Sequence, residues 1–240
     1  MRSLRPALWL AGVVVFTGAA GASAAPFAYI TNEGDPYVSN DVSVLDTATN
    51  TVVATVPAVG RYPEGVAVTP NGAYVYVGTE NDDSVTVIAT ATNTVVANVM
   101  VGNDPAGVAV TPDGTRVYVT NYGDFTASVI DTASNMVVAL VPVGFAPEGL
   151  VVTPDGTRVY VANNGSNTVS VIATATNMVV ATLPVGISPQ GVAVTRDGTH
   201  VYVANNGSNS LSVIATATNT VVATLPVGNH PVAFGNFIGP

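Results

Sequence analysis

Apolar and polar residues alternate along this chain in short runs that are separated by turn-forming clusters. In residues 149–186 the runs cover 150–153, 158–162, 168–172 and 178–183. They are rich in Val, Ile, Thr and Tyr and alternate with a period of two residues, which is typical of β-strands and not of helices. Clusters of Pro, Asp, Asn, Gly and Ser between the runs have the composition of tight turns. The pattern predicts four antiparallel strands joined by hairpins.

This stretch is one copy of a repeat of 42 residues. Glycines, prolines and tyrosines keep the period: Gly60, Gly102, Gly144, Gly186 and Gly228; Pro63, Pro105, Pro147, Pro189 and Pro231; Tyr76, Tyr118, Tyr160 and Tyr202. Repeats of helix pairs are excluded by the strand period. Four strands in a repeat of this length match a blade of a β-propeller, typically about 40 to 45 residues long.

The two ends of the repeat array are incomplete in complementary ways. Residues 27–31 align with a second strand, since Tyr29 takes the place of Tyr76, so the first blade lacks a first strand. Residues 228–235 read as a first strand without a second. We therefore expect an all-β, five-bladed propeller of four-stranded antiparallel blades. Its ring would be closed by the C-terminal strand pairing into blade one, which hides two open edges.

The first 24 residues have the features of a signal peptide. Arg2 and Arg5 precede an uncharged apolar run at residues 7–21, and Ala22, Ser23 and Ala24 supply small residues for cleavage after Ala24. The alternative is a retained membrane anchor, but the run is shorter than the ~20 residues that span a bilayer. We expect a periplasmic or secreted protein in which residues 25–240 form a single propeller domain.

Charge is scarce and negative. Charged residues make up 9% of the chain, against about 25% in ordinary globular proteins. Lysine is absent, and without Arg2 and Arg5 four arginines face fifteen acids, a net charge near −11. This balance excludes a basic nucleic-acid surface and disfavours anionic membranes. Zero cysteines exclude disulfides and thiolate sites. We expect a monomer without membrane insertion after removal of the signal.

Four segments carry a recognisable motif. Residues 118–121 read YVTN, and residues 29–32, 160–163 and 202–205 are variants of it. With the recurrent TPDG turn, the chain resembles the YVTN β-propeller repeat family, which includes YncE-like and surface-layer propellers. The resemblance implies an exported or cell-envelope propeller, usually without enzymatic activity. That family often has seven blades, and five repeats depart from this number.

Differences between the repeats indicate where a ligand would bind. Positions that are the same in every blade, such as Gly65, Gly107, Gly149 and Gly191, serve backbone geometry, and the Asn of each YVTN-like motif is expected to bond its own turn. The loops from the fourth strand of one blade to the first of the next differ sharply. They are expected to meet at one mouth of the central channel and supply these candidate ligand-binding residues: Arg61, Tyr62, Glu64, Asp104, Phe145, Glu148, Gln190 and His230.

The loops between second and third strands add a further set on the same face. Blades two and three contribute Glu80, Asp82, Asp83, Tyr122 and Asp124, and blade one has an expansion within residues 33–41. Blades four and five carry plain Asn-Asn-Gly-Ser-Asn. This asymmetry predicts a lopsided binding surface. The acidic loop of blade two lacks the ligand spacing of an EF-hand.

Known catalytic signatures are missing from the chain, including the nucleophile elbow, the phosphate loop and the paired-histidine zinc motif. The first hypothesis is therefore an exported, non-enzymatic scaffold that binds a protein or glycan of the cell envelope, with no cofactor. The alternative is a metal-assisted lyase or hydrolase, in which Glu64, Glu148 and His230 would hold a divalent cation or act as acid and base. His200 would only fill a hairpin on the opposite face. A structural surface-layer component would need a self-assembling edge.

Overall fold

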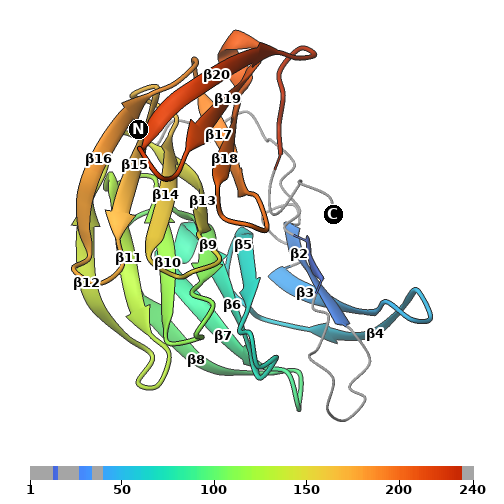
Figure 1. Cartoon of the computed structure of the whole chain (residues 1–240). Coiled ribbons are helices and arrows are strands. Elements are labelled where there is room, and N and C mark those ends of the chain that lie inside the picture. The colour runs from blue at the N-terminus through green and yellow to red at the C-terminus, as the bar shows by residue number, and fades with distance from the viewer. Residues whose placement is uncertain (1–12, 16–26, 34–39, 234–240) are drawn as a thin grey trace.

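The computed structural model describes residues 13–15, 27–33 and 40–233. These residues form five separate four-stranded antiparallel sheets in which consecutive strands are neighbours. The sheets follow one another along an arc, with the first and last blades at its two ends (Figure 1). The predicted all-β, five-bladed propeller architecture is confirmed, and each 42-residue repeat corresponds to one blade in its predicted strand order.

The strands have the following bounds. Blade one holds β1 (Val13–Val15), β2 (Phe27–Glu33), β3 (Asn40–Asp46) and β4 (Thr51–Val56); blade two holds β5 (Pro63–Val68), β6 (Tyr74–Thr79), β7 (Ser84–Ala89) and β8 (Thr94–Met100). Blade three holds β9 (Pro105–Val110), β10 (Arg116–Asn121), β11 (Thr126–Asp131) and β12 (Met136–Pro142); blade four holds β13 (Pro147–Val152), β14 (Arg158–Asn163), β15 (Thr168–Ala173) and β16 (Met178–Pro184). Blade five holds β17 (Pro189–Val194), β18 (His200–Asn205), β19 (Ser210–Ala215) and β20 (Thr220–Pro226). Two 3-10 turns, Glu80–Asp82 and Asn206–Ser208, complete the described elements.

The core lies between the blades. Second and third strands are buried on both faces because each sheet is packed between two neighbours, and Val and Ile fill these layers. Each apolar cluster joins two blades: Tyr118 and Val129 of blade three pack with Val159 and Ile172 of blade four. The fourth strands lie outermost and expose apolar side chains, such as Met136 and Met178 at 64% each. Blade-to-blade packing, and not any single sheet, therefore holds the fold together.

Repeated glycines allow close approach between backbones. A Cβ on Gly65, Gly107 or Gly149 would collide with the carbonyl oxygen of Ala106, Glu148 or Gln190, respectively, on the innermost strand of the next blade. Their predicted role in backbone geometry thus has a specific cause, which is contact between blades. Gly102, Gly144 and Gly186 instead lie against the side chains of Asn121, Asn163 and Asn205, respectively.

Those asparagines correct one expectation. The Asn that ends each YVTN-like motif does not bond its own turn. Asn163 is fully buried at the end of β14, where its Nδ2 donates to Thr168 Oγ1 at 3.0 Å and to Ser170 Oγ at 2.9 Å across the sheet. Its Oδ1 accepts a hydrogen bond from the backbone N–H of Gly144 at 3.1 Å. The strand continues one residue further than the turn composition suggests, and the amide fixes the loop that enters its own blade.

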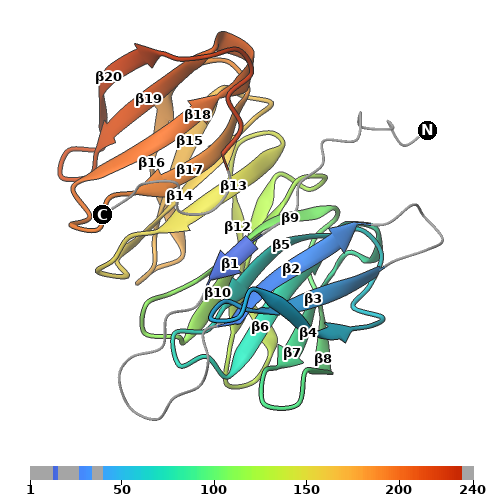
Figure 2. The same cartoon turned by 90° about the vertical axis from the view of Figure 1, so that its right-hand side faces the viewer.

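The inner edge of blade one differs from the expectation. β1, a segment of the predicted signal peptide, pairs antiparallel with β2, so that Val14 lies opposite Tyr29. Residues 231–233 are not in a strand, and residues 234–240 lie outside the described part of the chain. The backbone of Ala233 nevertheless contacts Gly191 of blade five, as Gln190 contacts Gly149 one blade earlier. Figure 2 shows β1 beside β2 in blade one. Ring closure by the C-terminal strand stays a prediction.

No helix within the described ranges is long and apolar enough to cross a membrane.

Candidate functional site

One face of the propeller is formed by two sets of loops that are hydrogen-bonded to each other. Each loop from a fourth strand to the next first strand lies against the second-to-third loop of the blade that it enters. Both sets of loops lie on one face, as predicted from the sequence. We call the residue that follows the repeated glycine of each fourth-to-first loop the entering residue. Its backbone N–H donates to a side chain 21 positions ahead: Arg61 to Asp82 Oδ2 (2.6 Å), Asn103 to Asp124 Oδ2 (2.8 Å), Phe145 to Ser166 Oγ (3.1 Å) and Ile187 to Ser208 Oγ (2.9 Å). These clamps hold the loop backbone in place while the side chains of the entering residues vary.

A second clamp follows one position later. The residue after the entering residue has a positive φ in each of the loops that follow a fourth strand, for example 52° at Asp104 and 52° at Ser188. Its backbone N–H donates to Asp83 Oδ1 in blade two (3.1 Å), to Asn167 Oδ1 in blade four (2.9 Å) and to Asn209 Oδ1 in blade five (2.8 Å). The second-to-third loops thus fix both residues of the turns that enter blades three and five.

These clamps account for three predicted ligand-binding carboxylates. Asp82 also accepts a hydrogen bond from Arg61 Nε at 2.6 Å, forming an exposed ion pair, and Asp124 accepts from Asn103 Nδ2 at 2.8 Å. Asp83 is engaged with the backbone of Asp104. The oxygens of Asp82, Asp83 and Asp124 therefore stabilise loops in this structure. Glu80 and Tyr122 lie half-buried in the same loops.

Phe125 breaks the pattern of the second clamp. It stands at the position held by Asp83, Asn167 and Asn209 in the other blades, and its φ is 58°. Asn and Asp tolerate this left-handed conformation, whereas a bulky aromatic residue is a genuine outlier there. Phe125 also has no side-chain oxygen to accept from the N–H of Ala146. The fold would be better served by asparagine at this position, so the phenylalanine needs another explanation.

The ring of Phe125 packs edge to face against Phe145 of the neighbouring loop. Their centroids lie 4.9 Å apart with an interplanar angle of 86°, a favourable geometry for an aromatic pair. Both remain open to solvent, at 40% and 58% exposure, and Ile187 of the next blade is 55% exposed. We call Phe125, Phe145 and Ile187 the apolar patch. It occupies blades three to five of the loop face, whereas the sequence predicted a surface centred on blades one to three.

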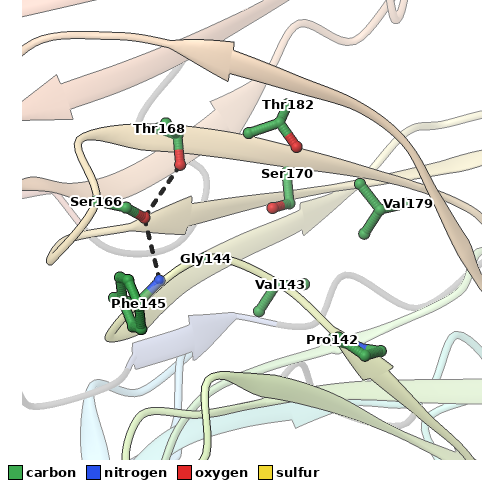
Figure 3. A pocket seen from close by; sticks show the side chains of 9 residues that line it. All are labelled: Pro142, Val143, Gly144, Phe145, Ser166, Thr168, Ser170, Val179 and Thr182. Atoms are coloured by element: carbon green, nitrogen blue, oxygen red, sulfur yellow. Dashed lines mark hydrogen bonds between the residues drawn. The ribbon is translucent and has the colours of Figure 1, made fainter.

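A cleft of about 320 Å³ opens beside the apolar patch, between blades three and four. In Figure 3, Phe145 and Ser166 lie at its loop end, while Pro142 and Val179 lie at the other. Hydroxyl groups of Ser166, Thr168, Ser170 and Thr182 line it together with Val143 and Gly144. Its lining contains no ionisable side chain. The cleft is suited to a neutral ligand with both apolar and hydroxyl surfaces.

The predicted acidic and basic candidates are dispersed. Glu64 and Glu148 are half-buried in β-bulges at the start of innermost strands β5 and β13, and their backbone carbonyls accept from Thr31 and Thr120 of the preceding blades at 3.0 and 2.6 Å. His230 is exposed, and its backbone N–H bonds Asn209. Within the described ranges, no three His, Asp or Glu side chains form a group that could hold a metal ion. The structure therefore does not gather Glu64, Glu148 and His230 into such a group.

The remaining predicted residues have separate positions. Tyr62 and Asp104 occupy the left-handed turn position, with φ 52° at each. Gln190 is 8% exposed on β17, and its Oε1 has no hydrogen-bond partner. The sequence prediction did not include Phe125 or the cleft hydroxyls. Phe125 could have been found by comparing positions 83, 125, 167 and 209, where only blade three departs from Asp or Asn.

This chain is similar to known protein families and solved structures. Residues 150–237 match the model of YNCE-like beta-propellers, and residues 37–148 match that of the cytochrome D1 heme domain. A hydrazine synthase from Kuenenia stuttgartiensis is 20% identical, with a TM-score of 0.62 over 85% of this chain and 84% of that one. A functionally unknown protein from Desulfotomaculum acetoxidans DSM 771 is 20% identical, with a TM-score of 0.70 over 86% of this chain and 72% of that one. No curated protein matches the sequence.

The fold and the loop face define a β-propeller. The resemblance to YncE-like propellers is confirmed by the family match in the second half of this chain. At 20% identity the two solved structures show the fold alone.

The match to a heme domain raises the question of whether heme fits this chain. Residues 37–148 contain no histidine, and their methionines, Met100 and Met136, are 66% and 64% exposed on outermost strands. His200 starts β18, at the hairpin end of its blade, as predicted, and His230 is exposed on the loop face. A heme site needs an axial ligand over an enclosed apolar pocket. The described residues do not provide this combination, so they do not fit a heme group.

Proposed function

We propose that this protein is an exported, non-enzymatic β-propeller that binds a neutral glycan of the cell envelope through the apolar patch and the adjacent cleft. Residues 1–24 direct export and are removed after Ala24, and the protein acts in the periplasm or outside the cell as a monomer. The scaffold brings no cofactor to this task.

The observation that carries the proposal is the conformation of Phe125. A non-glycine residue in a sparsely populated backbone region costs about 1 kcal/mol or more, and the missing clamp to Ala146 costs about 1 kcal/mol further. Three other blades show that Asp or Asn at this position lowers the first cost, because both tolerate the left-handed region, and avoids the second. Strain that the fold does not need is found mainly at sites of function. We infer that Phe125 is kept for its exposed ring.

The chemistry of the surroundings favours a sugar over a charged ligand. Phe125 and Phe145 present apolar ring faces and edges, which suit the C–H faces of a pyranose. The hydroxyls of Thr168, Ser170 and Thr182 lie within reach of the same cleft. Because the lining holds no charge, an anionic or cationic group would lose hydration there without a partner. A protein loop with an apolar tip is the competing ligand, and the experiment separates the two.

The test measures binding of the purified protein to immobilised neutral oligosaccharides and, in parallel, to envelope proteins freed of glycan. Phe145→Ala is expected to weaken glycan binding about tenfold or more, as loss of a buried aromatic contact does. Phe125→Asn is expected to raise the melting temperature and to weaken glycan binding together. Met178→Ala, which alters an equally exposed residue on the outer rim, is the matched control and should change neither.

Two results would contradict the proposal. If Phe125→Asn stabilises the fold but leaves glycan binding intact, the strained phenylalanine is not part of the site. If only glycan-free protein is captured, and Phe145→Ala abolishes that capture, the ligand is a protein and not a glycan.

A further inference from the structure

A second pocket, on the opposite face from the loops, contains an arginine with an unused hydrogen-bond donor. It has a volume of about 220 Å³ and lies between blades four and five, lined by Thr153, Asp155, Thr157, Arg158, Gly198, Thr216 and Ala217. The Nη1 atom of Arg158 is buried and has no hydrogen-bond partner. A buried guanidinium N–H without an acceptor is costly, so its environment requires an explanation.

Blade three provides an internal comparison. Every residue that lines the pocket has the same residue type 42 positions earlier: Thr111, Asp113, Thr115, Arg116, Gly156, Thr174 and Ala175. The one relevant difference is the residue opposite the arginine on the third strand. Arg116 pairs across the sheet with Asp131, and its Nη1 forms an ion pair with Asp131 Oδ2. Arg158 pairs across the sheet with Ala173, which offers no carboxylate.

The other polar groups of the pocket are already engaged. The Oγ1 hydroxyls of Thr153 and Thr157 donate to the carboxylate of Asp155 at 2.6 and 2.9 Å, and Thr216 Oγ1 donates to the carbonyl of Gly198 at 2.6 Å. Asp155 also accepts from the N–H of Thr157 at 3.0 Å and is exposed to solvent. Its charge is therefore shared among three donors of the hairpin and screened by water. The guanidinium of Arg158 hydrogen-bonds the side chain of Tyr160 and interacts with the charge of Asp155, but its Nη1 has no acceptor among the described residues and is left for an incoming ligand.

We propose that this pocket binds a small oxyanion through Arg158, with the ligand's oxygen taking the place that the Asp131 carboxylate occupies beside Arg116. The class covers carboxylate, phosphate and sulfate groups, because a guanidinium presents paired donors that match all of them. The site lies at the hairpin face, away from the apolar patch, and is independent of glycan binding there.

The experiment titrates the purified protein with inorganic phosphate, sulfate or acetate at constant ionic strength set with sodium chloride. Binding is read from the NMR shift of the Arg158 side-chain N–H groups and from the rise in melting temperature. A short oligogalacturonate tests whether the pocket recognises an anionic group that is attached to a larger molecule. Tighter binding of the oligomer than of acetate indicates an attached carboxylate, and equal or weaker binding indicates a free ion.

The decisive variant is Ala173→Asp, which gives Arg158 the partner that Arg116 has. It should weaken oxyanion binding about tenfold or more, since a charge-assisted hydrogen bond is lost to an internal competitor. The matched control is Ala89→Asp in blade two, which adds the same charge opposite Tyr74 and should leave binding unchanged. Arg158→Gln should abolish binding if it folds, while Asp131→Ala should create a second site in blade three.

Three outcomes would overturn the proposal. Oxyanion binding that persists in Ala173→Asp shows that Arg158 is not the donor. An equal loss in Ala89→Asp shows that binding follows net charge alone. No response of the Arg158 side chain to any of the three anions shows that the pocket does not take them.

Discussion

The hydroxyl of Tyr118 donates a hydrogen bond to Oδ1 of Asn177 at 2.6 Å, although the two residues are 59 positions apart. Tyr118 lies in the second strand of blade three, and Asn177 lies in the turn between the third and fourth strands of blade four. Tyr76 with Asn135 and Tyr160 with Asn219 repeat the bond at 2.8 and 2.7 Å. Each asparagine has a φ near 52°, so it serves the turn and the neighbouring blade together.

Loss of one such bond should destabilise the propeller measurably. Tyr118→Phe removes the hydroxyl and leaves the amide of Asn177 without its donor, which should lower the free energy of unfolding by about 1 kcal/mol. Chemical denaturation monitored by circular dichroism would measure the change. Tyr74→Phe is the control, because Tyr74 is 40% exposed and its hydroxyl makes no hydrogen bond among the described residues. Equal effects of the two substitutions would show that the bond between blades contributes nothing.

The same tyrosines predict a loss of stability in alkali. Burial, followed by the charges of Tyr74 and Asp131, raises the pKa of Tyr76 from 10.0 to about 12, and burial also raises the pKa of Tyr118 and of Tyr160. A raised pKa in the folded state gives stability that is present below the unfolded value and is lost as the pH rises. Melting temperatures should therefore fall between about pH 10 and pH 12, and phenolate absorbance should show Tyr76 titrating in that range. In Tyr76→Phe the fall should be smaller; an unchanged profile would contradict this assignment.

The hairpin aspartates predict a separate transition in acid. A hydrogen bond from Thr195, followed by bonds from Thr199, lowers the pKa of Asp197 from 3.8 to about 2, and the pKa values of Asp113 and Asp155 are lowered by their own threonines in the same way. Because the folded values are depressed, this stability is present above the ordinary pKa and is lost as the pH falls toward 2. Carboxyl NMR titration should show Thr195→Val raising the pKa of Asp197. No shift in that variant would refute the assigned cause.

Tyr29 makes a longer bond of the Tyr118 type to Asn93, at 3.5 Å, so closure of the ring should create a fifth. Tyr202 of blade five has no following blade, is half-buried and makes no hydrogen bond in the described part of the chain, while Asn50 of blade one is exposed with a φ of 54°. If residues 228–235 close the ring, these two should become partners. A double-mutant cycle with Tyr202→Phe and Asn50→Ala should then give a coupling of about 1 kcal/mol in the free energy of unfolding. A coupling near zero would leave the ends of the arc unjoined.

Truncation tests the C-terminal strand directly. A chain that ends at Gly228 loses the backbone of Ala233 that lies against Gly191, together with every residue proposed to pair into blade one. It should be insoluble or oligomeric, because two strand edges would be open to pairing between molecules. Light scattering and size-exclusion chromatography would show this. A truncated protein that is monomeric, with an unchanged melting temperature, would be incompatible with the predicted seal.

Much of this molecule could be predicted from the order of its residues. The 42-residue period, the strand alternation and the turn clusters gave the five blades and the face on which Phe145 and Asp82 lie, because these features depend on short-range spacing. The same spacing identified Gly65 and Gly149 as positions under backbone constraint. It could not show that the constraint comes from the next blade.

Packing between blades decided the rest. Only the tertiary structure shows that Asp82 and Asp124 are engaged as clamps, that the asparagine of YVTN is buried, and that Phe125 stands in a left-handed position beside Phe145. It alone shows that β1 pairs with the edge of β2 at which the sequence predicted the C-terminal strand. The reason is physical: a repeat pattern encodes each blade, whereas contacts such as that of Tyr118 with Asn177 join residues whose proximity depends on how the blades pack.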